Sequence, residues 1–290
     1  MGALSITAVT CTLTLSGCSA SLQTEPDASA PASPAPEVTN TPLPKPTSTL
    51  RHGTASDPLR YAALGDSYSA GVGGGYEHGR CQRSPNAYPR IIAKSDSIEL
   101  SRFVACSGAT TEDVLADQVD ALDPQIDLVT ITIGGNDLNV SALPSACGSG
   151  QTAECKAAVT TSVALLNTLP HKLERTYKAI AEAAPHARIL VADYPLFYDL
   201  PPITEKTIGS EEVSAAIAVD TAVASLDATI EQTVQKQREA GTDIQFVDVP
   251  FSGHGVNSEH PWFVLNGVDA YHPTKPGYKR YATVLESFLR

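Results

Sequence analysis

The sequence predicts an α/β fold built on a parallel β-sheet. Short apolar segments, rich in β-branched residues, alternate with longer segments whose apolar residues recur at helical spacing. Repetition of strand, helix and strand requires right-handed crossovers, which place helices on both faces of the sheet. At 290 residues, the chain is long enough for one such domain with a sizeable core.

Five strands are predicted, and the third and fourth have the near-continuous apolar run of strands buried on both faces. In chain order they are Leu59–Gly65, Glu99–Cys106, Ile126–Gly134, Ala187–Pro195 and Asp243–Val249. Helices are predicted at Asn86–Ser95, Thr110–Leu122, Thr168–Pro185, Gly209–Gly241 and Lys275–Arg290. Because the carboxyl ends of parallel strands meet at one edge, we expect the functional residues to gather in the loops there.

The beginning of the chain differs from this pattern. Residues 1–18 are apolar and rich in Ser and Thr, which is typical of an export signal, and they are too few for a transmembrane span. Residues 19–56 are rich in Pro, Ala, Ser and Thr and poor in bulky apolar side chains, which predicts a disordered tether. The folded domain is therefore expected over residues 57–290.

The segment Leu15-Ser16-Gly17-Cys18 resembles the lipobox of bacterial lipoproteins, in which the cysteine is lipidated and becomes the mature N-terminus. This resemblance predicts an exported protein that is anchored to the outer face of a membrane through Cys18. The alternative is an ordinary secretory signal that is cleaved nearby, which gives a secreted protein. Both readings place the protein outside the cytoplasm.

The net charge and the cysteine content limit which partners and ligands the protein can have. The formal net charge of −12 argues against a nucleic-acid partner and against electrostatic attraction to anionic lipid. Besides Cys11 in the signal segment and Cys18, four cysteines remain, which permit three pairings. The short spacing of one pair and the expected oxidising compartment favour the disulfides Cys147–Cys155 and Cys81–Cys106. No CxxC motif or zinc-type histidine spacing occurs, so no metal site is predicted.

Four loops at the expected edge carry polar residues marked by glycine. They are Gly65-Asp66-Ser67, Cys106–Thr110, Gly134–Asp137 and, before the last helix, Asp269–Pro273. Taken alone, Ser67 could be either a nucleophile or the N-cap of a helix. The residues of the other three loops decide whether Ser67 is interpreted as a nucleophile.

Acyl transfer by a serine enzyme needs a nucleophile, a base, a group that orients the base, and donors for the oxyanion. Ser67 is the candidate nucleophile, and its own N–H is a first oxyanion donor. Gly108 can bring a second N–H close because it has no side chain, and the amide of Asn136 is a third donor. His272 is the candidate base, and Asp269 is expected to orient its imidazole.

The blocks "GDSYSAG", "CSGAT", "GGND" and "DAYHP" resemble, in this order, the SGNH-hydrolase (GDSL lipase/esterase) family. The likeness covers Leu59 to Arg290 and is greatest to actinobacterial secreted lipases and phospholipases. It implies a flavodoxin-like three-layer α/β/α sandwich and a monomeric carboxylic ester hydrolase that needs no metal or cofactor. It also implies that a backbone carbonyl can replace Asp269 in orienting the base. A third disulfide of secreted relatives is missing here, where the loop has Gly255, Val256 and Asn257, so this loop is expected to be more mobile.

The predicted function is hydrolysis of acyl esters, small molecules or lipids and phospholipids, through an acyl-enzyme on Ser67. One alternative is an O-deacetylase of carbohydrate or peptidoglycan, because this fold uses the same site for acetyl esters. Another is a binding lipoprotein without catalysis. The intact set of Ser67, Asn136 and His272 disfavours it, since binding alone needs no base beside a serine.

Overall fold

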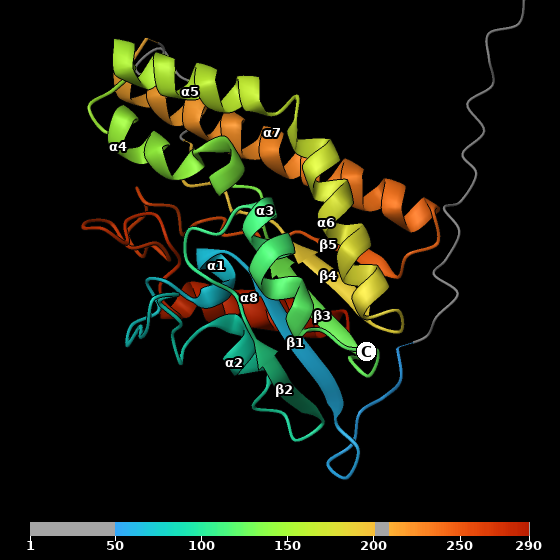
Figure 1. Ribbon diagram of the computed structural model, residues 1–290. Helices are drawn as coiled ribbons and strands as arrows, with labels where there is room; N and C mark the ends of the chain where they lie inside the picture. Colours follow the sequence, from blue (N-terminus) through green and yellow to red (C-terminus); the bar gives the residue numbers. More distant parts are fainter. Residues whose placement is uncertain (1–49, 201–208, 290) are drawn as a thin grey trace, which may run out of the picture. The chain divides into compact units, whose positions relative to one another are not determined.

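The computed structural model describes residues 50–200 and 209–289 (Figure 1). The predicted signal segment, the lipidation site Cys18 and the tether up to residue 49 lie outside the described residues, so the predicted domain limits stay predictions. Within the described range, the long helix Glu211–Glu239 is apolar enough to span a membrane by length and composition. This helix packs against the helix Leu169–Ala183 and the strand Ile244–Val247, as expected for a core helix of a folded domain.

A five-stranded parallel sheet forms the centre of the fold, with strand order β2-β1-β3-β4-β5. The strands are β1 (Leu59–Gly65), β2 (Ile98–Phe103), β3 (Leu128–Thr132), β4 (Arg188–Ala192) and β5 (Ile244–Val247). All five lie within a residue of the predicted segments or inside them. The predicted α/β sandwich is thereby confirmed. The third and fourth strands, β3 and β4, are buried as their apolar runs indicate, and β1 is buried to a similar degree.

Helices cover both faces of the sheet (Figure 1). One layer contains α2 (Tyr88–Ile92) and α8 (Lys275–Ser287), where the rings of Tyr88 and Tyr281 stack with centroids 5.5 Å apart. The other layer contains α3 (Thr111–Asp113) with the turns that continue it, α6 (Leu169–Ala183) and α7 (Glu211–Glu239). The continuation of α3 is a π-helical turn, Val114–Gln118, followed by a 3-10 turn, Val119–Ala121. The predicted single helix at this position is thus three short pieces.

A helical extension rises beyond the carboxyl ends of the strands (Figure 1). It consists of α4 (Leu143–Cys147), α5 (Ala153–Leu165) and the first half of α7. The sequence did not predict α4 or α5. Only Cys155 and Ser162 of α5 are buried, so the helix has no apolar stripe for a periodicity argument to detect. Its signals are the Thr152 side chain, which caps its first turn, and the disulfide at Cys155.

Candidate active site

The candidate nucleophile lies in a turn that only glycine permits. Strand β1 ends at Gly65, whose φ of +114° lies in the left-handed region, and a Cβ there would be 2.3 Å from the carbonyl oxygen of Thr132. The turn places Ser67 at the first position of the short helix α1, Ser67–Ala70. The N-cap of this helix is Asp66, which accepts a hydrogen bond from the N–H of Tyr68 at 3.0 Å. The capping role considered for Ser67 therefore belongs to its neighbour.

Ser67 and His272 are in direct contact although they are 205 residues apart. The Ser67 Oγ and the His272 Nε2 are separated by 2.9 Å, the geometry of a nucleophile and its base. Ser67 is only 7% exposed. Burial lowers the pKa of His272, against the opposing effect of its hydrogen bond to Asp269. A lowered pKa keeps the imidazole neutral at neutral pH, as a general base requires.

The ring of the candidate base His272 is held by a backbone carbonyl. The His272 Nδ1 lies 3.1 Å from the carbonyl oxygen of Asp269, and the backbone N–H of His272 donates to that same oxygen at 3.1 Å. The Asp269 carboxylate acts on the ring through its charge alone. The arrangement that the resemblance implied for close relatives is thus present, and Asp269 contributes through its main chain.

The loop before His272 is held in an unusual conformation. Tyr271 has a φ of +66°, which is costly for a residue with a side chain. Its carbonyl oxygen accepts a hydrogen bond from the Tyr68 hydroxyl at 2.7 Å, and its N–H donates to the carbonyl oxygen of Val264. Opposite this loop, a Cβ at Gly73 would lie 3.2 Å from the His272 Cβ. The neighbouring segments therefore fix where the base lies.

The structure brings Asn136 to the same cavity as Ser67 and His272. Asn136 opens a 3-10 turn after β3, and its side-chain Nδ2 donates to the carbonyl oxygen of Ala109 at 2.9 Å. One amide hydrogen therefore fixes the plane of the side chain, and the second remains for a ligand. Gly108, with φ +81°, lines the adjacent cavity, so its role as an oxyanion donor stays a prediction.

Below the nucleophile lies a buried carboxylate. Asp66 is 1% exposed and accepts hydrogen bonds from Thr132 Oγ1 at 2.9 Å, from the N–H of Tyr68 and from the hydroxyl of Tyr194. Burial raises the pKa of Asp66 to about 6, and the hydrogen bonds from Tyr194 and Thr132 oppose the rise. Because Asp66 accepts hydrogen bonds from three different segments, it holds the turn that carries Ser67.

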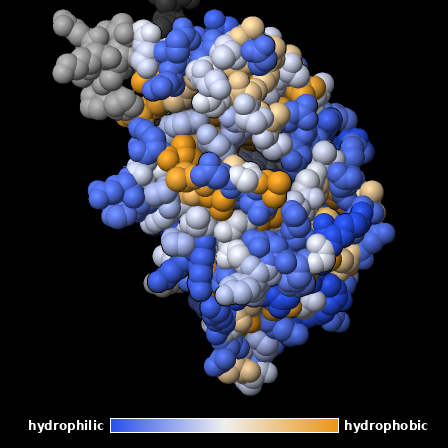
Figure 2. Space-filling view, turned by 90° about the vertical axis from the view of Figure 1, so that its left-hand side faces the viewer, coloured by the Kyte–Doolittle hydropathy of each residue, from blue (hydrophilic) through white to orange (hydrophobic). Residues whose placement is uncertain are grey.

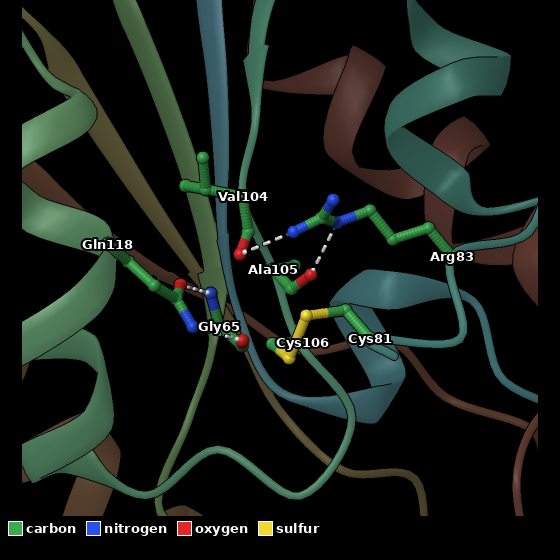
Figure 3. Close-up of a disulfide and its surroundings, with 7 residues drawn as sticks. All are labelled: Gly65, Cys81, Arg83, Val104, Ala105, Cys106 and Gln118. Atoms are coloured by element: carbon green, nitrogen blue, oxygen red, sulfur yellow. Dashed lines mark hydrogen bonds between the residues drawn. A yellow bond between two sulfur atoms is a disulfide. The ribbon is translucent and has the colours of Figure 1, made fainter. Parts of the chain in front are cut away.

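Gln118 and a disulfide hold the turn from the other side (Figure 3). The side-chain amide of Gln118, 2% exposed, accepts from the N–H of Gly65 at 2.7 Å and donates to its carbonyl oxygen at 2.9 Å. Pairing of β1 with β2 stops at Ala63, so Gln118 supplies the hydrogen bonds that a longer strand would supply. The N–H of Cys106, disulfide-bonded to Cys81, also donates to Gly65. The π-helical turn is what directs Gln118 inward.

The second predicted disulfide, Cys147–Cys155, is also present, and it joins α4 to α5 in the helical extension. In the loop that was expected to be mobile, Asp199 accepts hydrogen bonds from the N–H groups of Gly253 and Gly255 at 2.8 and 2.7 Å. Asn257 exchanges two further hydrogen bonds with the main chain of Asp199. This loop is therefore tied by hydrogen bonds. Among residues 50–200 and 209–289, no group of His, Cys, Asp and Glu side chains is arranged to hold a metal.

Comparison with known proteins identifies the family. Residues 63–280 match the model of the GDSL-like lipase/acylhydrolase family. The chain belongs to this family. It is 38% identical over 235 residues to a lipase of Streptomyces rimosus, covering 78% of this chain and 85% of that protein. It is 39% identical over 227 residues to lipase 1 of Streptomyces coelicolor, covering 75% and 81%.

Two solved structures have the same fold throughout the domain. The extracellular lipase of Streptomyces rimosus superposes with a TM-score of 0.70 at 34% identity, covering 79% of this chain and 99% of that one. The phospholipase A1 of Streptomyces albidoflavus gives 0.69 at 35% identity, covering 82% and 99%. This GDSL-family protein is therefore a serine-type carboxylic ester hydrolase, and its substrate is an ester.

Several supporting residues were not found from the sequence. Tyr68, Gln118 and Tyr194 hold the catalytic loops, but they look like ordinary core or surface residues of predicted helices and strand ends. The sequence offers one faint signal. Tyr194 lies at the carboxyl end of the predicted buried strand Ala187–Pro195, where a polar hydroxyl has to find a partner.

Proposed function

We propose that this GDSL-family enzyme hydrolyses acyl esters of lipids or phospholipids through an acyl-enzyme on Ser67. The observation that carries the proposal is the 2.9 Å contact between Ser67 Oγ and His272 Nε2. The cavity around this pair is walled mainly by apolar and aromatic groups, namely Val140, Pro144, Phe197, Ala270 and Tyr271. Such walls suit an acyl chain beside the reacting carbonyl.

The chemistry follows from the positions of the atoms. His272 Nε2 takes the proton of Ser67 Oγ as the oxygen attacks the ester carbonyl, and the imidazolium then protonates the departing alcohol. The Ser67 N–H, which has no acceptor inside its helix, and the free amide hydrogen of Asn136 stabilise the oxyanion. Gly108 is proposed as the third donor. Water, deprotonated by His272, attacks the acyl-enzyme and releases the acid and Ser67.

A lipid substrate is supported by the distribution of exposed apolar side chains. In the described part of the chain, the large ones are Tyr76, Val163, Leu196, Leu200, Ile217, Leu265 and Val268. All of them lie on the loops and helices of the carboxyl edge, and Val268 and Tyr76, 95% and 86% exposed, flank the loops that contact His272. Figure 2, which views this side, shows apolar residues gathered across the middle of the face. Apolar patches beside a site mark a surface for an apolar partner.

The protein is proposed to act outside the cytoplasm as a monomer. Two disulfides support export, since such bonds persist in oxidising compartments, and a similar structure is that of an extracellular lipase. Anchoring through Cys18 rests on the lipobox resemblance. Labelling with an alkynyl fatty acid tests it: wild type should be labelled and Cys18→Ser should not. Unlabelled wild-type protein found only in the culture medium would contradict the anchor.

The proposed nucleophile is tested with Ser67→Ala and a fluorophosphonate probe. We expect wild type to be labelled at Ser67 and to hydrolyse p-nitrophenyl esters and phosphatidylcholine, and Ser67→Ala to lose both while it keeps its circular dichroism spectrum. Ser145→Ala, at an exposed position on α4, is the matched control and should behave as wild type. Full labelling of Ser67→Ala would refute the assignment. Faster release of acetate from acetylated glycan than of longer acids from lipid would favour the deacetylase.

A further inference from the structure

Tyr194 is a single side chain that touches both halves of the catalytic apparatus. It follows β4, is 4% exposed, and its hydroxyl donates a hydrogen bond to Asp66 Oδ2. The hydroxyl oxygen of Tyr194 in turn accepts a hydrogen bond from the N–H of Gly135 at 3.1 Å. Asp66 directly precedes the nucleophile Ser67, and Gly135 directly precedes the oxyanion donor Asn136.

We propose that Tyr194 is a positioning residue that fixes the separation between Ser67 and Asn136 and thereby sets the rate of acyl transfer. This inference rests on the proposed function of Ser67 and Asn136. The two loops come from different strands, β1 and β3, and the tyrosine oxygen joins them by one donated and one accepted hydrogen bond. A displacement of about 1 Å between reacting groups can cost roughly 100-fold in rate, so a bond that holds both loops has a large effect on turnover.

The ring of Tyr194 has a separate role from its hydroxyl. It packs edge-on against Tyr68, with centroids 5.1 Å apart, and a Cβ at Gly135 would lie 3.2 Å from it. These contacts fill the space beneath the cavity and would persist with phenylalanine at this position. Tyr194→Phe therefore removes the bridge between the two loops without creating a void.

The bridge requires an ionised Asp66, because only the carboxylate accepts all of its hydrogen bonds. The pKa of Asp66, raised by burial to about 6, lies within the pH range over which kinetics can be measured. The hydroxyl of Tyr194 favours the charged form, so its loss moves that pKa upward. The titratable groups that face Asp66 or interact with it are Tyr68 on α1, Tyr88 on α2, Tyr194 after β4 and Tyr278 on α8.

The test compares Tyr194→Phe with Tyr281→Phe. Tyr281 is also fully buried and its hydroxyl donates to the carbonyl oxygen of Asp193 at 2.7 Å, but that hydroxyl makes no hydrogen bond to either catalytic loop. Its ring lies edge-on to Tyr68, with centroids 6.4 Å apart, and phenylalanine keeps this contact. We expect both variants to lose similar thermal stability. Only Tyr194→Phe should lower kcat on p-nitrophenyl butyrate, by roughly 10- to 100-fold with little change in KM. Its acid limb of kcat/KM against pH should also move to higher pH.

Two further variants keep the outcome decisive. In an Asp66→Asn background the acid limb due to Asp66 should vanish, and adding Tyr194→Phe should cost far less than it does in wild type. Equal kcat for Tyr194→Phe and Tyr281→Phe, or an unmoved acid limb, would overturn the inference. If Tyr194→Phe does not fold, an unchanged acid limb in Asp66→Asn alone would overturn it. Ser67→Ala separates the two levels, because retained activity there refutes the proposed function instead.

Discussion

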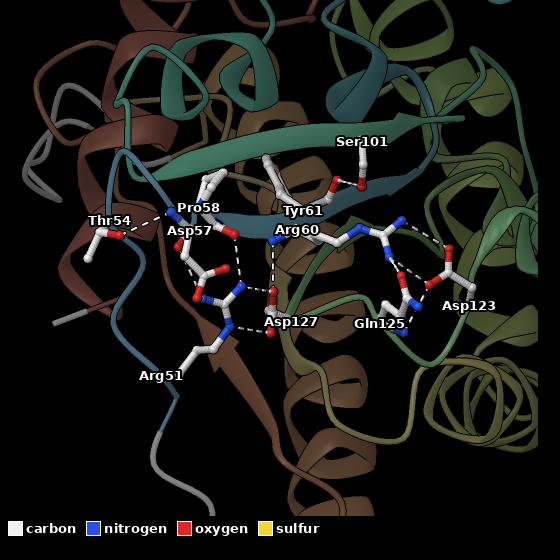
Figure 4. A network of polar contacts seen from close by, with 10 residues as sticks. All are labelled: Arg51, Thr54, Asp57, Pro58, Arg60, Tyr61, Ser101, Asp123, Gln125 and Asp127. Atoms are coloured by element: carbon white, nitrogen blue, oxygen red, sulfur yellow. Dashed lines mark hydrogen bonds and ion pairs between the residues drawn. The ribbon is translucent and has the colours of Figure 1, made fainter.

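The two edges of the sheet are held together by different chemistry. At the amino edge, where strands begin, charged side chains join the segments (Figure 4). Arg51 binds Asp127, which precedes β3, at 2.7 and 2.8 Å and also reaches Asp57, while Arg60 at the start of β1 pairs with Asp123. At the carboxyl edge, the turn around Ser67 is held by neutral donors and by the buried carboxylate of Asp66.

The difference reflects exposure. Arg51 and Asp57 keep 38% and 79% of their side chains exposed, so water screens their charges and each pair adds little. Asp66 and Gln118 are 1% and 2% exposed, and any polar group left without a partner there would be costly. Contacts that can be lost at small cost in stability therefore lie far from Ser67, and contacts whose loss is costly lie beneath it. Four predictions, taken from the largest expected effect to the smallest, can sharpen this contrast.

The largest effect is expected for Asn136→Ala. Loss of an oxyanion donor should lower kcat by roughly 10²–10³-fold with KM much less affected, since the amide binds charge that develops in the transition state. Steady-state kinetics on a p-nitrophenyl ester measure this. Asn139→Gly is the control, because Asn139 is exposed and its φ of +54° suits glycine. An unchanged kcat for Asn136→Ala would show that the amide does not face the oxyanion.

The disulfides come next. In the chain-entropy picture, removing Cys81–Cys106, with a sequence separation of 25, should cost about 3.5 kcal/mol of unfolding free energy. Removing Cys147–Cys155, with a separation of 8, should cost about 2.5 kcal/mol. Urea unfolding of the paired Cys→Ser variants measures both. Only the first should also reduce kcat, because Cys106 donates to Gly65; equal kcat in both would disconnect that disulfide from the nucleophile turn.

The strands and the four polar loops could be predicted from the sequence because burial and backbone conformation restrict which residues can stand there. The strands were predictable because β1, β3 and β4 are buried along most of their length and are therefore mostly apolar. The four loops were predictable because glycine is required where φ is positive, as at Gly65, and because their polar residues stand out beside apolar runs. Local sequence carries both kinds of information.

The supports of the site were not predictable for the opposite reason. Gln118 faces Gly65 only because a π-helical turn interrupts a helix, and a helical pattern of period 3.6 gives no warning of that. Tyr194 joins two loops through hydrogen bonds to Asp66 and Gly135, which are 128 and 59 residues away in sequence. The orienting carbonyl of Asp269 belongs to the main chain, where the identity of the side chain is uninformative.

That carbonyl leads to the third prediction. Asp269→Asn should reduce kcat only a few-fold, because the carbonyl that accepts from His272 is retained and only a nearby charge is removed. Since that charge raises the pKa of His272, its loss should also move the acid limb due to His272 to lower pH. Kinetics against pH measure both. A loss as large as that of His272→Ala would instead assign the orienting role to the carboxylate.

The smallest effect is expected at the amino edge, from Arg51→Ala. Exposed pairs contribute about 0–1 kcal/mol, so the free energy of unfolding should fall by less than about 1 kcal/mol and kcat should not change.

Burial of Asp127 opposes its ionisation, but the hydrogen bonds from Arg51 and from the N–H of Arg60 outweigh it and lower the pKa of Asp127. A carboxylate with a lowered folded-state pKa stabilises the protein above its unfolded pKa of about 4, and this contribution is lost as pH falls further. The difference between wild type and Arg51→Ala should therefore be present at pH 7, shrink below about pH 4, and weaken in high salt. Urea unfolding at these conditions measures it, with Arg80→Ala, a surface arginine far from this network in sequence, as the control. A large loss of kcat in Arg51→Ala would mean that the two edges are coupled through the sheet, and the contrast between them would fail.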